Sequence, residues 1–367
     1  MLFFCLWGFS LILCLLSFCF NKFNRTSGLI ALLIYGIIEG NPNYFYGDAS
    51  VYFNDYMFKT QQFEKGYNFL TGLFGTRFDY LNFRLITSIL FLLLLYFAVV
   101  TITNRVSLFS MLYGIGAFPN DVQQVRNQMA SVFIVFGIVF LYKYGKKGII
   151  PAFFTIYLGS LFHSIALIFL LVPILFYFDN LIKLFNKISV VGLITAIIAK
   201  LATSIPNLNT LVSGALSIFS SRETASTNVT DIYSNNVIPI SIWTLTIIVT
   251  LIMFYLITSV YEIRYTGLVR SSNIFSLEKV VVISFYIWII GLVLLASSIE
   301  YIRILRISSV LLFIVIAKLT EQNKDKPILL PNRIVVISLL YSIILLILQA
   351  WIYYVNLDNW FKALNFI

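Results

Sequence analysis

Long apolar runs are the feature that most restricts the fold of this chain. They measure roughly 12 to 24 residues and follow one another through most of the sequence. Hydrophobic residues make up 60% of the chain and its mean hydropathy is +0.94, whereas charged residues make up only 11%. A water-soluble domain of this length carries far more charge. The sequence therefore predicts an all-α integral membrane protein, folded as a single polytopic domain over residues 1–367.

The apolar runs predict about twelve transmembrane helices. Residues 148–178 suit either two short helices or one long one. The first run lacks the basic residues that precede a signal-peptide core, so we expect it to be retained as a helix. Two larger polar segments, at about 40–83 and 206–236, interrupt the series. The expected spans lie near residues 2–20, 27–39, 84–103, 106–119, 128–142, 148–161, 163–178, 188–205, 237–260, 280–298, 307–318 and 334–354.

Basic residues are distributed unevenly between the two sides of these helices. Threading by the positive-inside rule places 15 of the 25 Lys and Arg residues in the segments of one side. That side is then cytoplasmic, and both termini and the two larger polar segments lie outside. The net charge of +10 follows from this orientation, so we expect no nucleic-acid partner.

A polar stretch from Asn120 to Ala130 contains the most informative residue, Arg126. A guanidinium in lipid costs on the order of 3 kcal/mol, so a chain retains it mainly where it faces a partner, a wet cavity or an anion. Gln123, Arg126 and Asn127 share one face of the helix that begins there. A helix N-terminus with an arginine fork suits phosphate. The alternative is an interfacial arginine paired with Asp121 or with a lipid headgroup.

His163 is the only histidine and lies at a turn between two apolar runs. Its neutral form is suited to act as a base and its charged form to donate to an anion. The alternative is a turn histidine held by backbone carbonyls. Arg303 and Arg306 share a helix face, where they are suited to a second phosphate or a glycan. The alternative there is an interfacial cluster neutralised by Glu300.

The first larger polar segment supplies carboxylates and aromatic rings on the same side. Asp48 and Glu64 are candidates to accept a proton from a sugar hydroxyl. Tyr52 and Tyr56 are candidates to stack on sugar rings. The alternative is a folded interfacial loop with an aromatic belt. Nucleotide-binding, zinc-hydrolase, serine-hydrolase and DxD motifs are absent from the sequence, so we expect a reaction without metal or other cofactor.

Taken in order, these motifs resemble the EpsG-like branch of the Wzy-type polysaccharide polymerases. The resemblance covers nearly the whole chain. The residues that carry it are Asp48, Tyr52 and Tyr56, then Phe63-Glu64-Lys65-Gly66-Tyr67, then Gln123, Arg126 and Ala130, then Phe162-His163-Ser164, and finally Arg303 and Arg306.

The resemblance implies a membrane glycosyltransferase that polymerises a surface polysaccharide, such as O-antigen, capsule or exopolysaccharide. Such enzymes join oligosaccharide repeat units linked to polyprenyl (undecaprenyl) diphosphate, at the outer face of the bacterial cytoplasmic membrane. It also implies a fold similar to the GT-C-type glycosyltransferases. The expected partners are the lipid-linked substrate, membrane lipids, a flippase and a chain-length regulator.

The same resemblance assigns roles to the candidate residues. Arg126, supported by Arg303, would face the leaving diphosphate, and the base would be His163, Asp48 or Glu64. Substrate binding would fall to Gln123, Asn127, Arg306, Tyr52 and Tyr56.

Three other classes stay open. A lipid-linked oligosaccharide flippase also suits about twelve helices, but transporters favour internal repeats and charges near the midplane. A membrane acyltransferase would use the histidine, and a glycan ligase shares the polymerase chemistry.

Overall fold

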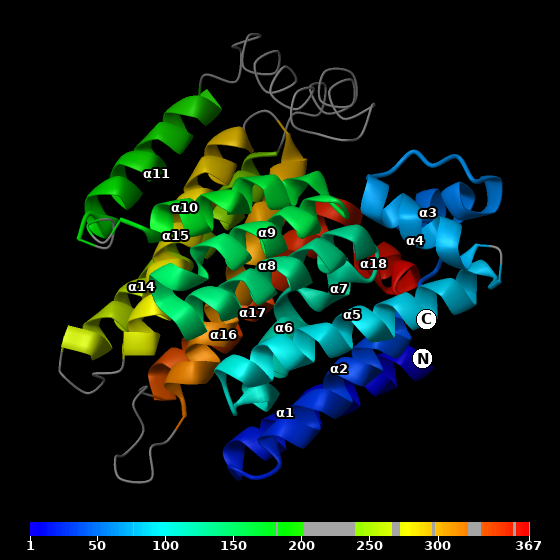
Figure 1. The fold of residues 1–367 in the computed structure, drawn as a ribbon, viewed down its shortest axis with the longest axis horizontal. Helices are drawn as coiled ribbons and strands as arrows, with labels where there is room; N and C mark the ends of the chain where they lie inside the picture. The colour runs from blue at the N-terminus through cyan, green and yellow to red at the C-terminus, as the bar shows by residue number, and fades with distance from the viewer. Residues whose placement is uncertain are drawn as a thin grey trace.

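The computed structural model describes residues 1–75, 77–178, 180, 183–201, 239–265, 272–295, 298–321, 332–354 and 357–366. Within these ranges the chain is helical and contains no strand (Figure 1). The helices are α1 (Leu2–Cys19), α2 (Asn24–Gly40), α3 (Gly47–Phe58), α4 (Lys65–Phe74), α5 (Tyr80–Ile102), α6 (Val106–Gly116), α7 (Phe118–Asp121), α8 (Val125–Tyr144), η1 (Gly145–Gly148), α9 (Ile149–Ser160), η2 (Ser164–Leu170), α10 (Leu171–Phe176), α11 (Phe185–Leu201), α14 (Ile240–Tyr265), α15 (Ser272–Leu294), η5 (Ile299–Tyr301), α16 (Ile302–Leu319), α17 (Asn332–Tyr354) and α18 (Leu357–Ala363).

Six helical stretches among the described residues are long and apolar enough to cross a membrane, which supports a polytopic membrane protein. The expected number of about twelve spans is not confirmed. Helix α6 has 11 residues, or about 16 Å, against a hydrocarbon core of ~30 Å. Helix α16 carries three basic residues. The six stretches are Leu2–Cys19, Tyr80–Ile102, Val125–Ser160, Ile240–Tyr261, Ser276–Leu294 and Asn332–Ile352.

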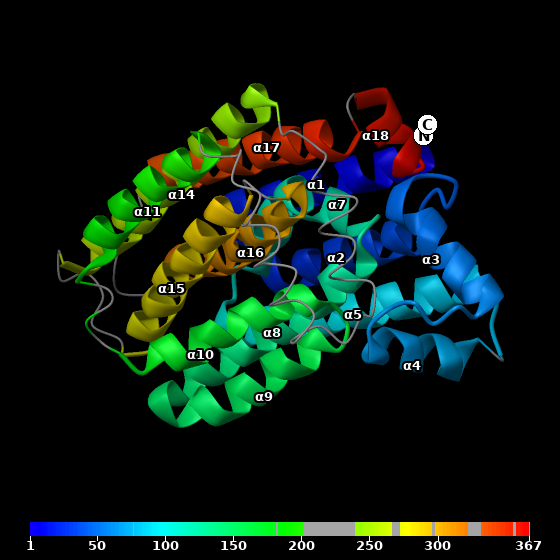
Figure 2. The ribbon, with the colours of Figure 1, turned by 90° about the horizontal axis from the view of Figure 1, so that it is seen from above.

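The centre of the bundle is formed by α6, α8, α15 and α16. Helix α16 is buried on almost every side, and α15 packs against it. These two helices lie between the α14–α17 pair and the group of α8, α9 and α10 (Figure 2). Helices α1, α5 and α11 carry large exposed apolar side chains, such as Ile12, Leu90 and Ile194. Such side chains suit contact with lipid.

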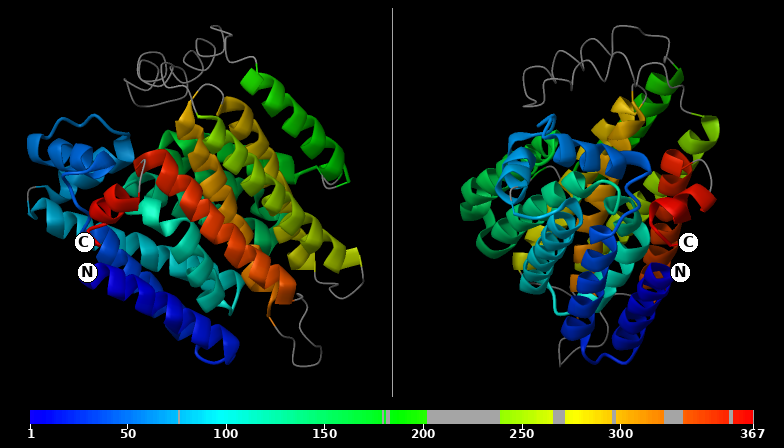
Figure 3. Two further views of the ribbon diagram at one scale, coloured as in Figure 1. Left: turned by 180° about the vertical axis from the view of Figure 1, so that it is seen from behind. Right: turned by 90° about the vertical axis from the view of Figure 1, so that its right-hand side faces the viewer.

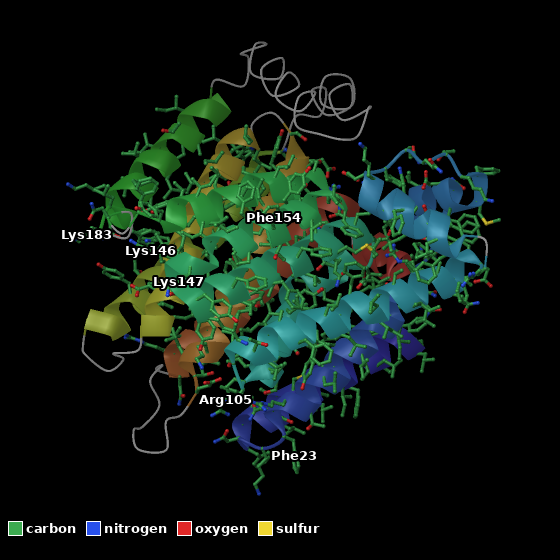
Figure 4. The ribbon with its side chains drawn as sticks, in the orientation of Figure 1. Phe23, Arg105, Lys146, Lys147, Phe154 and Lys183 are labelled. Carbon is green, nitrogen blue, oxygen red and sulfur yellow. The ribbon has the colours of Figure 1, made fainter. Side chains whose placement is uncertain are left out.

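The two ends of the bundle differ in charge. Arg105, Lys146, Lys147 and Lys183 lie at the end opposite to α3, α4 and both chain termini (Figure 4). The termini lie side by side, and the N-terminal amine of Met1 donates to the carbonyl of Phe366 (Figure 3). This segregation agrees with the expected threading, while the orientation in a membrane stays a prediction.

The first larger polar segment is folded rather than a loop, because it contains α3 and α4. Tyr52 and Tyr56 are four residues apart and so lie on one face of α3. They pack with the aromatic residues of α4 and α5; Tyr56 stacks on Phe83 at 4.9 Å between ring centroids. The buried face of α3 is therefore short and made of aromatic residues. A search for long apolar runs does not detect a helix of this kind. The second polar segment, 206–236, lies outside the described residues.

Candidate functional site

The candidate residues meet where several helices begin. Asp48 is the second residue of α3, Arg126 the second of α8, and Arg303 the second of α16. Glu64 directly precedes α4, and His163 directly precedes η2. Helix N-termini carry partial positive charge. Their convergence, with two arginines added, makes a region suited to an anion.

Arg126 and Glu64 form a buried ion pair through Nη1 and Oε2, with side chains 5% and 2% exposed. The guanidinium lies 4.0 Å from the ring centroid of Phe63 and 5.3 Å from that of Tyr52. Removing one partner of such a pair leaves a buried charge uncompensated. Arg126 is therefore paired with Glu64, and not with Asp121, the partner that the sequence offered as an alternative.

Glu64 also fixes the turn that carries His163. Its Oε1 accepts a hydrogen bond from the backbone N–H of Ser164 at 3.2 Å. The N–H of Gly66 donates to the carbonyl of Leu161 at 2.7 Å. A Cβ at Gly66 would lie 2.7 Å from that carbonyl oxygen and 2.9 Å from the Leu161 Cβ, so only glycine allows this approach. The start of α4 thus clamps residues 161–164.

His163 is buried and its two ring nitrogens face different donors. Nδ1 accepts from the backbone N–H of Ile165 at 3.1 Å, which caps the start of η2. Nε2 lies 3.0 Å from Nη1 of Arg303. The alternative derived from the sequence placed backbone carbonyls at this ring. The described contacts of the ring include a backbone N–H and an arginine.

Arg303 connects the histidine to two acids. It pairs with Glu300, and its Nη2 lies 3.5 Å from Oδ2 of Asp48. Burial raises the pKa of the Glu300 carboxyl above its usual range, and Arg303 opposes that rise. The Asp48 side chain is 42% exposed, against 13% for Arg303. Asp48 and Arg303 therefore form the accessible edge of the site, with the Glu64–Arg126 pair beneath.

Arg306 belongs to a separate, buried cluster. Its Nε lies 3.2 Å from Oδ1 of Asp121, and its Nη2 donates to Oε1 of Gln124 at 2.7 Å. With its amide oxygen turned toward Arg306, Asn127 accepts from Nη2 at 2.6 Å. Tyr113 donates to the other oxygen of Asp121 at 2.9 Å. Arg306 is thus paired with Asp121, whereas Glu300 pairs with Arg303.

Three expected substrate-binding residues make internal contacts. Gln123 donates to the carbonyl of Ala363 at 2.6 Å and accepts from the N–H of Ala49 at 3.3 Å, which joins α18 to α3. Tyr52 is 3% exposed, and Tyr56, at 7%, donates to the carbonyl of Phe78. Substrate-binding roles for Gln123, Tyr52 and Tyr56 stay predictions, and burial of both rings does not favour sugar stacking.

Two charged residues that were not singled out from the sequence, Glu39 and Arg84, are fully buried. Arg84 donates through Nε to the carbonyl of Glu39 at 3.1 Å and through Nη2 to that of Val122 at 2.5 Å. It therefore holds the turn that precedes α8 and Arg126. The cost of an arginine in an apolar span, which singled out Arg126, applies equally to Arg84 and was the available signal.

The described part of the chain contains no group of three or more His, Cys, Asp and Glu side chains placed to hold a metal ion. No curated protein and no solved structure matches the sequence. A family model, that of the EpsG family, matches residues 43–365, which include every candidate site residue. The chain therefore belongs to the EpsG family, a family of Wzy-like polysaccharide polymerases.

Proposed function

We propose that this protein polymerises a surface polysaccharide by joining oligosaccharide repeat units carried on polyprenyl diphosphate, at the outer face of the cytoplasmic membrane. Family membership supports polymerisation. The observation that carries the chemistry is Arg303. At the accessible edge of the site it contacts both an imidazole and a half-exposed carboxylate. A diphosphate-binding cation and groups able to handle a proton thus lie together.

The reaction places definite demands on such a site. The acceptor hydroxyl attacks the anomeric carbon of the donor sugar, and its proton passes to a base. The bond from that carbon to the diphosphate oxygen breaks, and the electron pair stays on the diphosphate. Donors aimed at this developing charge lower the barrier. Arg303 and the converging helix N-termini supply them at the edge, and Arg126, paired with Glu64 beneath, helps to hold the histidine turn in place.

Of the three candidate bases, Glu64 is the least favoured. One of its oxygens pairs with Arg126 and the other accepts from Ser164, and its side chain is 2% exposed. His163 and Asp48 both lie beside Arg303 at the accessible edge. His163 and Asp48 therefore remain the two candidates for the base.

The charge of the bundle supports the outward orientation. The site lies at the end with α3, α4 and the termini, and the basic residues Arg105, Lys146 and Lys147 lie at the other (Figure 4). Under the positive-inside rule the basic end is cytoplasmic. The lipid-linked unit then reaches the site only after a flippase has moved it outward, and a chain-length regulator is the other expected partner.

The test is the fate of lipid-linked units in cells that lack the protein. We expect single repeat units to accumulate on the outer leaflet and polymer to disappear. Units trapped on the inner leaflet would indicate a flippase instead. Purified protein in proteoliposomes should convert lipid-linked single units into a ladder of longer ones. Transfer only to a different acceptor, without a ladder, would indicate a ligase.

A further inference from the structure

Two of the groups that contact the histidine ring of the site can only donate. The backbone N–H of Ile165 lies 3.1 Å from Nδ1, and Nη1 of Arg303 lies 3.0 Å from Nε2. A backbone N–H and a guanidinium have no lone pair to offer. A neutral imidazole has one acceptor nitrogen, and an imidazolium has none. The ring therefore satisfies only one of the two donors at a time.

The two donors differ in how firmly they are held. Ile165 is two residues from His163, in a turn clamped by Glu64 on Ser164 and by Gly66 on Leu161. The guanidinium of Arg303, in contrast, ends a flexible side chain at the accessible edge and also contacts acids. Arg303 is therefore the donor that turns when a ligand arrives. With Arg303 turned, Nδ1 keeps its bond from Ile165, and the ring proton lies on Nε2.

We propose that His163 is a donor to the substrate rather than the base: its Nε2–H and the guanidinium of Arg303 together bind an anionic oxygen of the diphosphate. This inference rests on the proposed function, because it takes the diphosphate of the lipid-linked unit as the ligand. An acceptor atom between the two donors removes the conflict that exists without it. Binding thereby fixes the tautomer of the ring.

The proton of the acceptor hydroxyl then passes to Asp48. Its Oδ2 lies 3.5 Å from Nη2 of Arg303, and its side chain is 42% exposed. When Arg303 turns to the diphosphate, it also releases this carboxylate. In the transfer step the hydroxyl oxygen bonds to the anomeric carbon and its proton moves to Asp48. The bond to the diphosphate breaks, and the electron pair stays on the oxygen held by His163 and Arg303.

The sequence offers an unusually direct test, since it contains one histidine. Protein carrying ¹⁵N-histidine in lipid bilayers gives one imidazole, whose two nitrogens report the tautomer by solid-state NMR. Inorganic diphosphate is the probe. We expect saturating diphosphate to leave a single neutral tautomer with the proton on Nε2. A bound state with the proton on Nδ1 and the lone pair on Nε2 would overturn the inference. An unchanged spectrum at saturating diphosphate would also overturn it.

Two substitutions extend the test to activity. In His163→Gln the amide NH₂ keeps a donor near the position of Nε2, but a glutamine cannot act as a base. We expect this variant to stay within about tenfold of the unaltered protein, and His163→Ala to lose about 10²-fold or more, because removing one such donor costs that much. Equal loss in both variants, at equal protein level, would contradict the donor role. Arg303→Gln is the control for the NMR experiment, and diphosphate should no longer shift its imidazole signals.

These results separate the inference from the proposed function. A tautomer fixed on Nδ1–H in a protein that still extends lipid-linked units overturns the donor role and leaves the polymerase intact. Failure of the protein to make a ladder from lipid-linked units overturns the polymerase, whatever the tautomer.

Discussion

Glu64 and Arg126 form a buried ion pair although 62 residues separate them in the chain. The pair joins the start of α4 to the start of α8. Through its second oxygen Glu64 also holds the N–H of Ser164, beside His163. Arg126 therefore acts on the accessible edge only indirectly, because it fixes the Glu64 carboxylate, which in turn fixes the turn of His163.

A double-mutant cycle should show this coupling. Arg126→Leu alone leaves the Glu64 carboxylate buried without its partner, which we expect to lower the free energy of unfolding by about 3 to 5 kcal/mol. The double variant Arg126→Leu with Glu64→Leu should recover most of that loss. Thermal unfolding in detergent measures both. Additive losses in the double variant would mean that the pair is not coupled as the contacts indicate.

Arg126→Lys should be nearly as defective in polymerisation as Arg126→Ala. Lysine keeps the charge but loses the planar group that lies 4.0 Å from the Phe63 ring centroid. We expect both variants to lose on the order of 10²-fold in rate, because each misplaces the Glu64 carboxylate that holds the histidine turn. The assay is ladder formation from lipid-linked units in proteoliposomes without added metal, at matched protein level. Near-full activity of the lysine variant would reduce Arg126 to a charge anchor.

Gly66→Ala tests the clamp on the histidine turn. The added methyl would lie 2.7 Å from the carbonyl oxygen of Leu161, so α4 and the turn must move apart. We expect at least about a tenfold loss of activity, because small misplacements of reacting groups are costly. Gly72→Ala is the matched control on the same helix, since a methyl group added there would meet no atom within 4 Å. Equal activity of the two variants would argue against the clamp.

The positions of the long helices were predicted from the sequence more completely than the contacts between their side chains. Each expected apolar span overlaps a described helix, because long apolar runs are dictated by the lipid. Helices α3 and α4 were missed, since their buried faces consist of a few aromatic residues such as Tyr52 and Tyr67. Arg126, His163 and Arg303 were expected at one side of the membrane, and the contacts do place them at one end of the bundle.

Pairing between distant residues could not be derived in the same way. Local spacing put Arg303 and Arg306 on one helix face with Glu300 as a shared neutraliser. In the folded chain Arg306 turns to Asp121 on α7, whereas Arg303 keeps Glu300 and gains Asp48 from α3. Which acid each arginine pairs with depends on how α3, α7 and α16 pack. Spacing along the chain does not give that packing.

The outward orientation is tested by cysteine labelling. In a variant whose three native cysteines are replaced, Ser50→Cys on α3 should react with an impermeant thiol reagent in intact cells. Lys147→Cys, at the basic end, should react only after the membrane is permeabilised. The reverse pattern would place the site on the cytoplasmic side and remove the outer-leaflet substrate with it.

Asp48→Asn tests whether Asp48 is the base or only an ion-pair partner of Arg303. Asparagine keeps the size of the side chain and its place beside Arg303 but cannot accept the proton, so we expect kcat to fall by about 10² to 10⁴-fold with little change in KM.

Glu300→Gln is the matched control, since Glu300 also pairs with Arg303. Its side chain is 24% exposed, against 42% for Asp48. We expect the control to change kcat by less than about tenfold, because a glutamine amide keeps a hydrogen bond to Arg303 and Glu300 accepts no proton in the proposed step. Kinetics on lipid-linked units in proteoliposomes measures both variants. If Asp48→Asn kept the rate of Glu300→Gln, the carboxylate of Asp48 would be a positioning group, and the proton would have to leave by another residue.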